Sequence, residues 1–292
     1  MPKAKVNNIE IEYDTFGDPS SKPLLLVMGL GGQMIAWVDE MCEGLANQGL
    51  YVIRFDNRDV GLSTKFDEAG LPNLLEISAT VACGEKPEVP YTLEDMADDA
   101  IGVLDDLNVE KAHICGASMG GMIAQVIAYR HPSRVLSLTS IMSNTGNPEI
   151  KQPTQELIQE LFKPLPTERE ANIEEGVKRG RLTYGTFPYN EEQARLMRTK
   201  AYDRCFYPIG IMRQVAAISA TGNRKPKLAS ITVPTLVVHG KEDPLVPVEG
   251  GIDTADTIPG AELLLLDGMG HSFPPEVAPQ ILEALVANIN KV

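Results

Sequence analysis

GASMGG, residues Gly116–Gly121, lies between the apolar run KAHIC and the apolar segment MIAQVIAYR. Small residues flank Ser118 on both sides in the pattern G-x-S-x-G. This pattern is typical of a strand that turns sharply into a helix, because bulky neighbours would crowd such a turn. We therefore expect Ser118 to protrude from a strand–turn–helix junction, where free N–H groups and the helix dipole favour negative charge.

The rest of the chain repeats this alternation of short apolar runs and amphipathic segments of helical length. Strands that cross over through helices pair in parallel, so the pattern predicts an α/β fold with a mostly parallel twisted sheet flanked by helices. Residues 5–17 predict an opening hairpin that turns at Asn7–Asn8. The other expected strands are 23–29, 51–58, 111–117, 134–143, 233–240 and 261–268. The expected helices are 34–49, 92–109, 119–131 and 276–292.

The pattern changes between residues 146 and 222, where helical segments such as TQELIQELF and NEEQARLMRTKAY occur without an obvious strand. No repeat, low-complexity tract or flexible linker separates this part from the rest. We therefore expect a helical cap at 146–222, inserted into one core made of residues 1–145 and 223–292. A chain of 292 residues is long enough to bury such a core.

The composition argues against several classes of partner. The formal net charge of -14 and the lack of a basic stripe disfavour nucleic acid. The sequence has no signal-peptide pattern and no run of about 18 apolar residues, which argues against a membrane span. The four separated cysteines have neither a C-x-x-C pair nor a metal-ligand spacing, so we expect a cytoplasmic protein without metal or organic cofactor. No heptad seam indicates a partner surface, which leaves the oligomeric state open.

A serine needs a neighbouring base to become a nucleophile at neutral pH, usually a histidine oriented by a carboxylate. The chain has four histidines. His113 lies within a predicted strand, and His131 and His239 end predicted elements, so a core or capping role explains each of them. His271 lies in the loop DGMGHSFPPE after the last predicted strand, and we expect it to be the base.

The carboxylate that orients the base should follow a neighbouring strand. HGKEDPLVP supplies Asp243 after the strand predicted at 233–240, and Pro244 restricts the backbone just after it. Glu242 is the competitor, and a solvated surface position explains it. We therefore favour Asp243.

Two backbone N–H groups are expected to stabilise an oxyanion beside Ser118. Met119 begins the helix after the turn and supplies one of them. Leu30 lies in MGLGG, residues 28–32, where glycines let the backbone approach a ligand, and it is our candidate for the other. An ordinary glycine-rich turn is the alternative reading of this loop.

VMGLGG, FDNRDVGLS, GASMGG, HGKEDPLVP and GMGHSFP together resemble the α/β-hydrolase superfamily over essentially the whole chain. In particular, they resemble its serine esterases of the aclacinomycin methylesterase branch. The resemblance implies that Ser118 is the nucleophile, Asp243 the acid and His271 the base, in the chain order of that superfamily. It also implies an oxyanion hole formed by the N–H groups of Leu30 and Met119.

The chain departs from the superfamily at the oxyanion loop, because Met28–Gly29 stands where many relatives carry His-Gly. In FDNRDVGLS, three residues match a recurring family segment: Asp56, Arg58 and Ser63. We expect these three to bond backbone groups and to play a structural role.

We therefore expect a carboxylic ester hydrolase that acts on a small to medium, largely apolar ester through an acyl-enzyme on Ser118. Carbon–carbon bond hydrolases and cofactor-free haloperoxidases use the same three residue types and stay open as alternatives, as does a slow-turnover ligand receptor on this fold. The cap is rich in aromatic side chains, which either build its own core or contact the substrate. The pocket residues we expect are Trp37, Tyr184, Tyr189, Phe206 and Tyr207.

Overall fold

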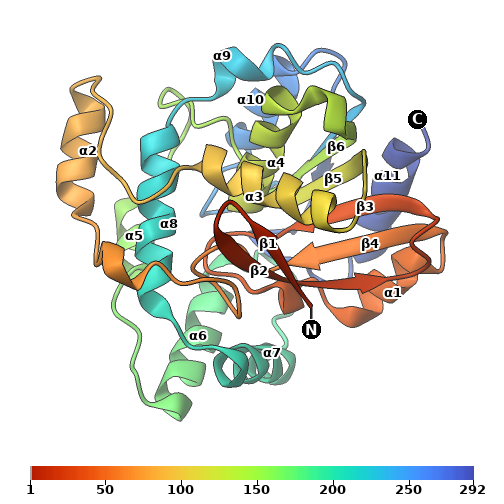
Figure 1. The fold of residues 1–292 in the computed structure, drawn as a ribbon. Helices are drawn as coiled ribbons and strands as arrows, with labels where there is room; N and C mark the ends of the chain where they lie inside the picture. Colours follow the sequence, from red (N-terminus) through yellow and green to blue (C-terminus); the bar gives the residue numbers. More distant parts are fainter. Residues whose placement is uncertain (1) are drawn as a thin grey trace.

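The computed structural model describes residues 2–292, in which one eight-stranded sheet is flanked by helices (Figure 1). Its strands lie in the order β1-β2-β4-β3-β5-β6-β7-β8. The first two pairs in this order are antiparallel and the other five are parallel, which confirms the predicted α/β architecture. The strands are β1 (Lys3–Val6), β2 (Ile9–Phe16), β3 (Lys22–Val27), β4 (Leu50–Phe55), β5 (Ala112–Ala117), β6 (Val135–Ile141), β7 (Thr235–Gly240) and β8 (Glu262–Leu266).

The helices cover both faces of the sheet and fill the segment between β6 and β7. The α-helices are α1 (Asp39–Ala46), α2 (Leu74–Ala82), α3 (Leu93–Asp106), α4 (Met119–Arg130), α5 (Gln155–Leu161), α6 (Arg169–Thr183), α7 (Glu191–Arg204), α8 (Pro208–Thr221), α9 (Lys225–Leu228), α10 (Glu249–Thr257) and α11 (Ala278–Ile289). Short 3-10 turns lie at Met34–Ala36, Asp67–Ala69 and Pro132–Arg134. No helix within residues 2–292 combines the length and the apolar character needed to cross a bilayer.

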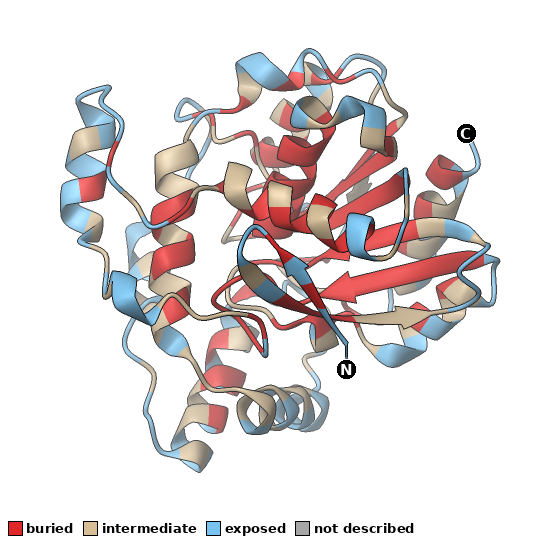
Figure 2. Ribbon diagram, in the orientation of Figure 1, coloured by how far each residue is buried: buried red, intermediate tan, exposed pale blue. Residues whose placement is uncertain are grey.

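The alternation of side chains along the strands divides the core between the two faces of the sheet. On β3, Leu25 and Val27 belong to the buried cluster that includes α3 and α4, whereas Leu24 and Leu26 belong to the cluster with α1 and α11. Successive residues of a strand point to opposite faces, so a strand covered on both faces is apolar throughout. Figure 2 shows the central strands and α4 as the most completely buried part of the molecule.

The predicted hairpin is confirmed, and the helix predicted at 92–109 begins with a side-chain cap. The opening hairpin turns at Asn7 and Asn8, whose φ angles of 47° and 64° fit a two-residue turn of the type that suits twisted strands. Thr92 caps α3 by accepting the Asp95 N–H, while the Asp95 side chain accepts the Thr92 N–H. Both features depend on residues close together in the chain.

The predicted helix at 34–49 is wrong, because the structure breaks it at Trp37. Met34–Ala36 forms one 3-10 turn, and α1 begins only at Asp39. Trp37 takes an extended conformation, its ring is buried in the core, and its carbonyl accepts a hydrogen bond from the Arg54 side chain. Burial of the indole and pairing of this carbonyl therefore outweigh the helical preference of the surrounding residues.

The segment between β6 and β7 contributes the helices α5–α9 and no strand to the sheet. It lies against the carboxyl ends of the parallel strands. The Gln33 amide, which follows β3, donates to the carbonyls of Ala201 and Cys205, and the His271 N–H, which follows β8, donates to the Thr183 carbonyl. These contacts place the helices beside the loops in which the site residues were predicted.

Candidate active site

Ser118 occupies a strained turn between β5 and α4. Its φ of 58° and ψ of -123° are unusual for a residue with a side chain, and its N–H donates to the Ile141 carbonyl at 2.9 Å. Small neighbours are necessary here. A Cβ at Gly116 would lie 2.0 Å from the Gly120 carbonyl oxygen, and a Cβ at Gly120 would lie 2.0 Å from the Val27 carbonyl oxygen. The flanking glycines thus let strand and helix meet closely enough to expose the hydroxyl.

His271 reaches this hydroxyl from the loop after β8. Its Nε2 lies 2.9 Å from Ser118 Oγ, which is hydrogen-bond distance. Both residues are half-buried, so the pair is protected by protein and remains accessible. The structure therefore brings together a serine and an imidazole that are far apart in the sequence.

Asp243 holds the other nitrogen of this imidazole. Its Oδ2 lies 2.7 Å from His271 Nδ1, while its Oδ1 accepts the N–H groups of Leu245 and Val246 at 2.9 and 2.8 Å. Burial opposes ionisation of this carboxyl, but the charge of His271 and hydrogen bonds from His239 and His271 outweigh it and lower its pKa to about 2. The carboxylate is therefore charged at neutral pH and can orient the ring.

The competing residues bond elsewhere. Glu242 is exposed and accepts the Gly268 N–H at 2.6 Å. His113 bonds the Ser137 hydroxyl at 2.8 Å and His131 bonds Asp98 at 2.7 Å. His239 bonds the Val246 carbonyl at 2.7 Å, and its Nε2 also lies 3.6 Å from Asp243 Oδ2, so it contacts the carboxylate without bonding Ser118.

The loop after β3 lies directly against Ser118. A Cβ built on Gly29 would lie 3.0 Å from Ser118 Cβ and 3.5 Å from its Oγ. The peptide N–H of Leu30 belongs to the next residue of this loop. Neither this N–H nor that of Met119 has a hydrogen-bond partner within residues 2–292. The neighbouring Gly31 N–H, by contrast, donates to Gln214 at 2.9 Å and fixes the loop. Two free donors thus flank the serine.

The three matching residues of FDNRDVGLS bond other parts of the core and do not contact Ser118, Asp243 or His271. Asp56 accepts the Met34 N–H at 2.8 Å, and the Ser63 hydroxyl donates to the Asp56 carbonyl at 2.6 Å, so both bond the backbone. Arg58 instead pairs with the buried carboxylate of Asp99, at 2.6 Å. All three residues serve structure, although a side chain rather than the backbone is the main partner of Arg58.

Two ion pairs that sequence reasoning missed join this segment to the helices inserted after β6. Arg204 of α7 pairs with Asp56 at 2.7 Å, and Arg213 of α8 pairs with Asp59 at 2.7 Å, with both members of the second pair fully buried. No spacing in the sequence indicates which charges will meet across such a distance. The pairs anchor α7 and α8 to the loop after β4.

The predicted pocket residues separate into two groups. Phe206 and Tyr207 line a cavity of about 100 Å³ beside Gly31. Trp37 does not line it, because its ring lies in the core with its centroid 5.4 Å from that of Phe273. The other two residues, Tyr184 and Tyr189, pack edge to face on each other, and the Tyr189 hydroxyl donates to a carbonyl of α6. These three aromatics pack within the protein instead of lining this cavity.

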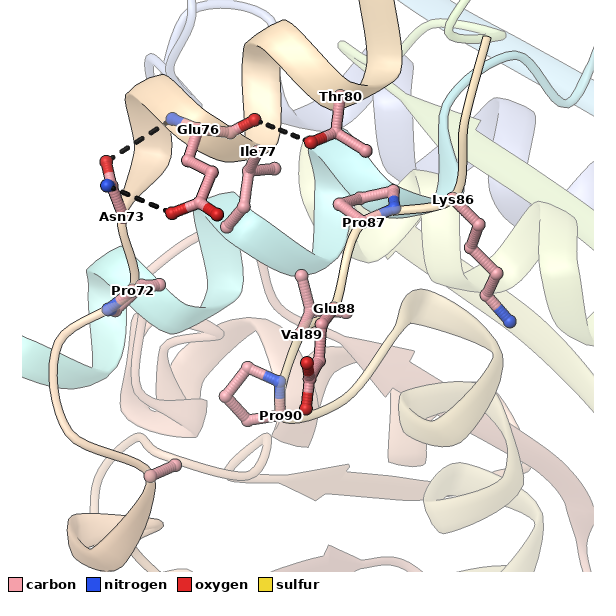
Figure 3. A pocket seen from close by; sticks show the side chains of 11 residues that line it. Pro72, Asn73, Glu76, Ile77, Thr80, Lys86, Pro87, Glu88, Val89 and Pro90 are labelled. Atoms are coloured by element: carbon pink, nitrogen blue, oxygen red, sulfur yellow. Dashed lines mark hydrogen bonds between the residues drawn. The ribbon is translucent and has the colours of Figure 1, made fainter.

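A larger cleft of about 460 Å³ lies between α2 and residues 86–90 (Figure 3). It contains none of the residues that surround Ser118. As Figure 3 shows, the Asn73 side chain bonds the N–H and carboxylate of Glu76, and the Thr80 hydroxyl donates to the Glu76 carbonyl, so these polar groups serve the helix itself. The cleft offers no group placed for nucleophilic chemistry, and the site at Ser118 is the stronger candidate.

Comparison with known proteins identifies relatives in sequence and in fold. The sequence profile of the family described as "alpha/beta hydrolase fold" matches residues 22–276. Rhodomycin D methylesterase DnrP of Streptomyces peucetius is 28% identical over 99% of this chain and 98% of its own. The enol-lactonase from Burkholderia xenovorans superposes with a TM-score of 0.74 at 22% identity, over 99% of this chain and 100% of that one. A meta-cleavage product hydrolase from Pseudomonas fluorescens superposes with a TM-score of 0.77 at 20% identity, over 100% of this chain and 98% of that one.

Proposed function

The chain belongs to the α/β-hydrolase family, and we propose that it is a serine hydrolase that cleaves carboxylic esters through an acyl-enzyme on Ser118. The observation that carries the proposal is the chain of contacts from Ser118 Oγ to His271 Nε2 at 2.9 Å and from His271 Nδ1 to Asp243 Oδ2 at 2.7 Å. The similarity to a methylesterase over nearly the whole chain supports an ester as the substrate.

Acylation follows from this arrangement. The Ser118 hydroxyl attacks the ester carbonyl carbon while His271 Nε2 accepts its proton, and Asp243 stabilises the imidazolium that forms. The N–H groups of Leu30 and Met119 donate to the oxyanion of the tetrahedral intermediate. The intermediate then collapses, the ester C–O bond breaks, and His271 protonates the departing alcohol.

Deacylation uses the same groups in reverse. A water molecule gives a proton to the neutral His271 and attacks the acyl carbon, so that a second oxyanion forms at the same two N–H groups. The Ser118 oxygen leaves and recovers its proton from His271. The products are a carboxylic acid, an alcohol and the free enzyme.

Residues 146–222 act in this proposal as a cap over a core made of residues 1–145 and 223–292. The hydrogen bonds from Gln33 and His271 to this segment support that role, because these two residues follow the carboxyl ends of β3 and β8. Phe206 and Tyr207 line the cavity beside Gly31, which favours substrates that are largely apolar and of small to medium size.

The test is hydrolysis of p-nitrophenyl acetate, butyrate and octanoate by the wild type and by Ser118→Ala. We expect turnover in the wild type and a loss of at least about 10³-fold in the variant. Equal rates in the two proteins, or no turnover in the wild type, would overturn the esterase proposal. Assays of carbon–carbon substrates and a search for tightly retained ligands would then decide between a carbon–carbon hydrolase and a receptor.

A further inference from the structure

The cavity beside Gly31, called here the cap cavity, lies between the loops that follow β3 and β4 and the helices inserted after β6. Its volume is about 100 Å³, roughly the share of three water molecules in the liquid. Most of its wall is apolar or aromatic. The lining side chains that carry nitrogen or oxygen are Gln33, Asp59, Asn172, Arg198, Tyr202 and Tyr207.

The cap cavity adjoins the proposed reaction centre. Gly31, which lines it, follows Gly29 by two residues, and Gly29 lies against the Ser118 side chain. Successive Cα atoms are 3.8 Å apart, so the Cα atoms of these two glycines are separated by at most about 7.6 Å. The Ser118 side chain and the cap cavity thus lie along the same short loop after β3, two residues apart.

Arg198 is the one unpaired arginine among seven in the cap helices. The side chains of Arg169, Arg179, Arg181, Arg195, Arg204 and Arg213 each form an ion pair with an aspartate or glutamate. The Arg198 side chain has neither an ion pair nor a hydrogen bond with any part of residues 2–292. The Arg198 side chain packs across α6 at Gly176, where a Cβ built on the glycine would lie 3.2 Å from Arg198 Nε. Arg198 also lines the cap cavity.

The other polar side chains of the cap cavity are already bonded. The Gln33 amide donates to the carbonyls of Ala201 and Cys205. The Asn172 amide donates to the Pro166 carbonyl, and the Tyr202 hydroxyl donates to the Thr167 carbonyl. Asp59 is neutralised by Arg213, with which Tyr207 also bonds. The Arg198 guanidinium is thus the polar group of this wall that is free to bind a ligand.

The surroundings of Arg198 favour an anion. Protein packed around the guanidinium lowers its pKa and Tyr189 opposes this effect, while the nearby charge of Arg179 is paired with Glu175. Asp59, the acidic residue that lines the cavity, is already paired with Arg213, and Glu174 and Glu175, which precede Gly176 on α6, are paired with Arg195 and Arg179. A positive charge in partly apolar surroundings gains most from a ligand of opposite charge.

We propose that the cap cavity binds a carboxylate carried by the substrate, through the guanidinium of Arg198, so that the preferred substrates are esters with a free carboxylate a few carbons from the ester. The planar fork of N–H donors on arginine matches the two oxygens of a carboxylate, and the apolar walls accommodate the connecting carbons. The inference rests on the proposed ester hydrolysis at Ser118 and adds the chemical class of the substrate.

The kinetic test compares the monomethyl esters of succinate, glutarate and adipate with methyl butanoate, pentanoate and hexanoate, which match them in chain length. We expect the wild type to show a kcat/KM at least about 10-fold higher for the acidic member of one or more pairs. Arg198→Gln should lower that kcat/KM by about 10- to 100-fold, mainly through KM, and leave the neutral esters unchanged. Arg195→Gln is the matched control, because Arg195 lies on the same helix and is also exposed, but it is paired with Glu174 and does not line the cap cavity.

The outcomes separate this inference from the proposed function. Ser118-dependent hydrolysis of neutral esters without any preference for acidic ones would overturn the carboxylate site and leave the esterase proposal intact. An equal loss for acidic and neutral esters in Arg198→Gln would also overturn it.

A binding experiment does not depend on turnover. Calorimetric titration of Ser118→Ala with the same monomethyl esters should show saturable binding of at least one ester. Adding Arg198→Gln should weaken that binding at least about 10-fold, whereas adding Arg195→Gln should not. If Ser118→Ala binds none of the acidic esters, the carboxylate site is excluded even if the wild type hydrolyses no ester at all.

Discussion

Gly185 forms an antiparallel β-bridge with Met269 and thereby joins the helices inserted after β6 to the loop that carries His271. Further backbone bonds extend the bridge, since the Gly270 N–H donates to the Tyr184 carbonyl at 3.1 Å and the His271 N–H donates to the Thr183 carbonyl at 2.6 Å. The position of the proposed base therefore depends on a segment outside the sheet.

Gly185→Ala should lower kcat by about 10- to 100-fold, because an ångström-scale shift of a reacting group is that costly. The φ of Gly185 is +96°, and a Cβ there would lie 2.3 Å from the Gly268 carbonyl oxygen, so the His271 loop has to move. Gly260→Ala is the control, since Gly260 also has a positive φ, +75°, but has no atom within 4 Å of its Cβ position. Similar kcat values in the two variants, measured with p-nitrophenyl butyrate, would refute the positioning role.

Asp243→Asn should lower kcat by about 10³- to 10⁴-fold while the protein stays folded, because an amide cannot stabilise the imidazolium and favours the wrong tautomer of the base. Glu242→Gln is the comparison. Its amide oxygen can still accept the Gly268 N–H, so we expect less than about a 10-fold change. Steady-state kinetics of both variants decides which carboxylate orients His271, and a larger loss in the Glu242 variant would reverse the assignment.

Gly29→Ala should lower kcat by about 10- to 100-fold with little effect on thermal stability. A Cβ at Gly29 would lie 3.0 Å from both the Ala117 carbonyl oxygen and Ser118 Cβ, and this crowding would push the Leu30 N–H away from the oxyanion. In Gly44→Ala, the new Cβ has no neighbour within 4 Å and lies within α1, so stability should rise by about 0.5–1 kcal/mol with unchanged kcat. Unchanged kcat in Gly29→Ala would remove the oxyanion role of this loop.

Acidification should destabilise the protein through His113. Burial, with a smaller contribution from Lys22, lowers the pKa of His113 from 6.5 to about 4 in the folded protein. Between these two values the unfolded chain binds more protons than the folded one, so the free energy of unfolding falls as pH decreases from about 6.5 to about 4, by on the order of 3 kcal/mol.

The pH dependence of urea unfolding tests this expectation. His113→Gln should reduce the slope of unfolding free energy against pH by about one proton in that window. An identical slope in the wild type and in His113→Gln would show that another group controls acid stability.

The sequence predicts the local structure around Ser118 because the decisive contacts are local. Gly116 and Gly120 meet across a single turn, and Thr92 bonds Asp95 within one turn of α3. The alternation of strands and helices was visible for the same reason. His271 and Asp243 could also be chosen from sequence, since few histidines and carboxylates follow predicted strands.

The helix predicted at 34–49 shows where local patterns fail. Its residues are amphipathic at helical spacing, but the core takes up the Trp37 ring and Arg54 binds the Trp37 carbonyl. Those partners lie on other elements, so no window of neighbouring residues contains the information. The same limit applies to the pocket, where two of the five predicted aromatics line the cap cavity.

The sequence by itself determined the α/β architecture, the turn that exposes Ser118 and the residue types of the site, because these depend on side chains a few positions apart and on the order of elements. Only the tertiary structure decided that Gly185 clamps the His271 loop and that Arg198 is left without a partner in the cap cavity. Whether a glycine is in contact or a charge is paired depends on which distant segments the folded chain brings together.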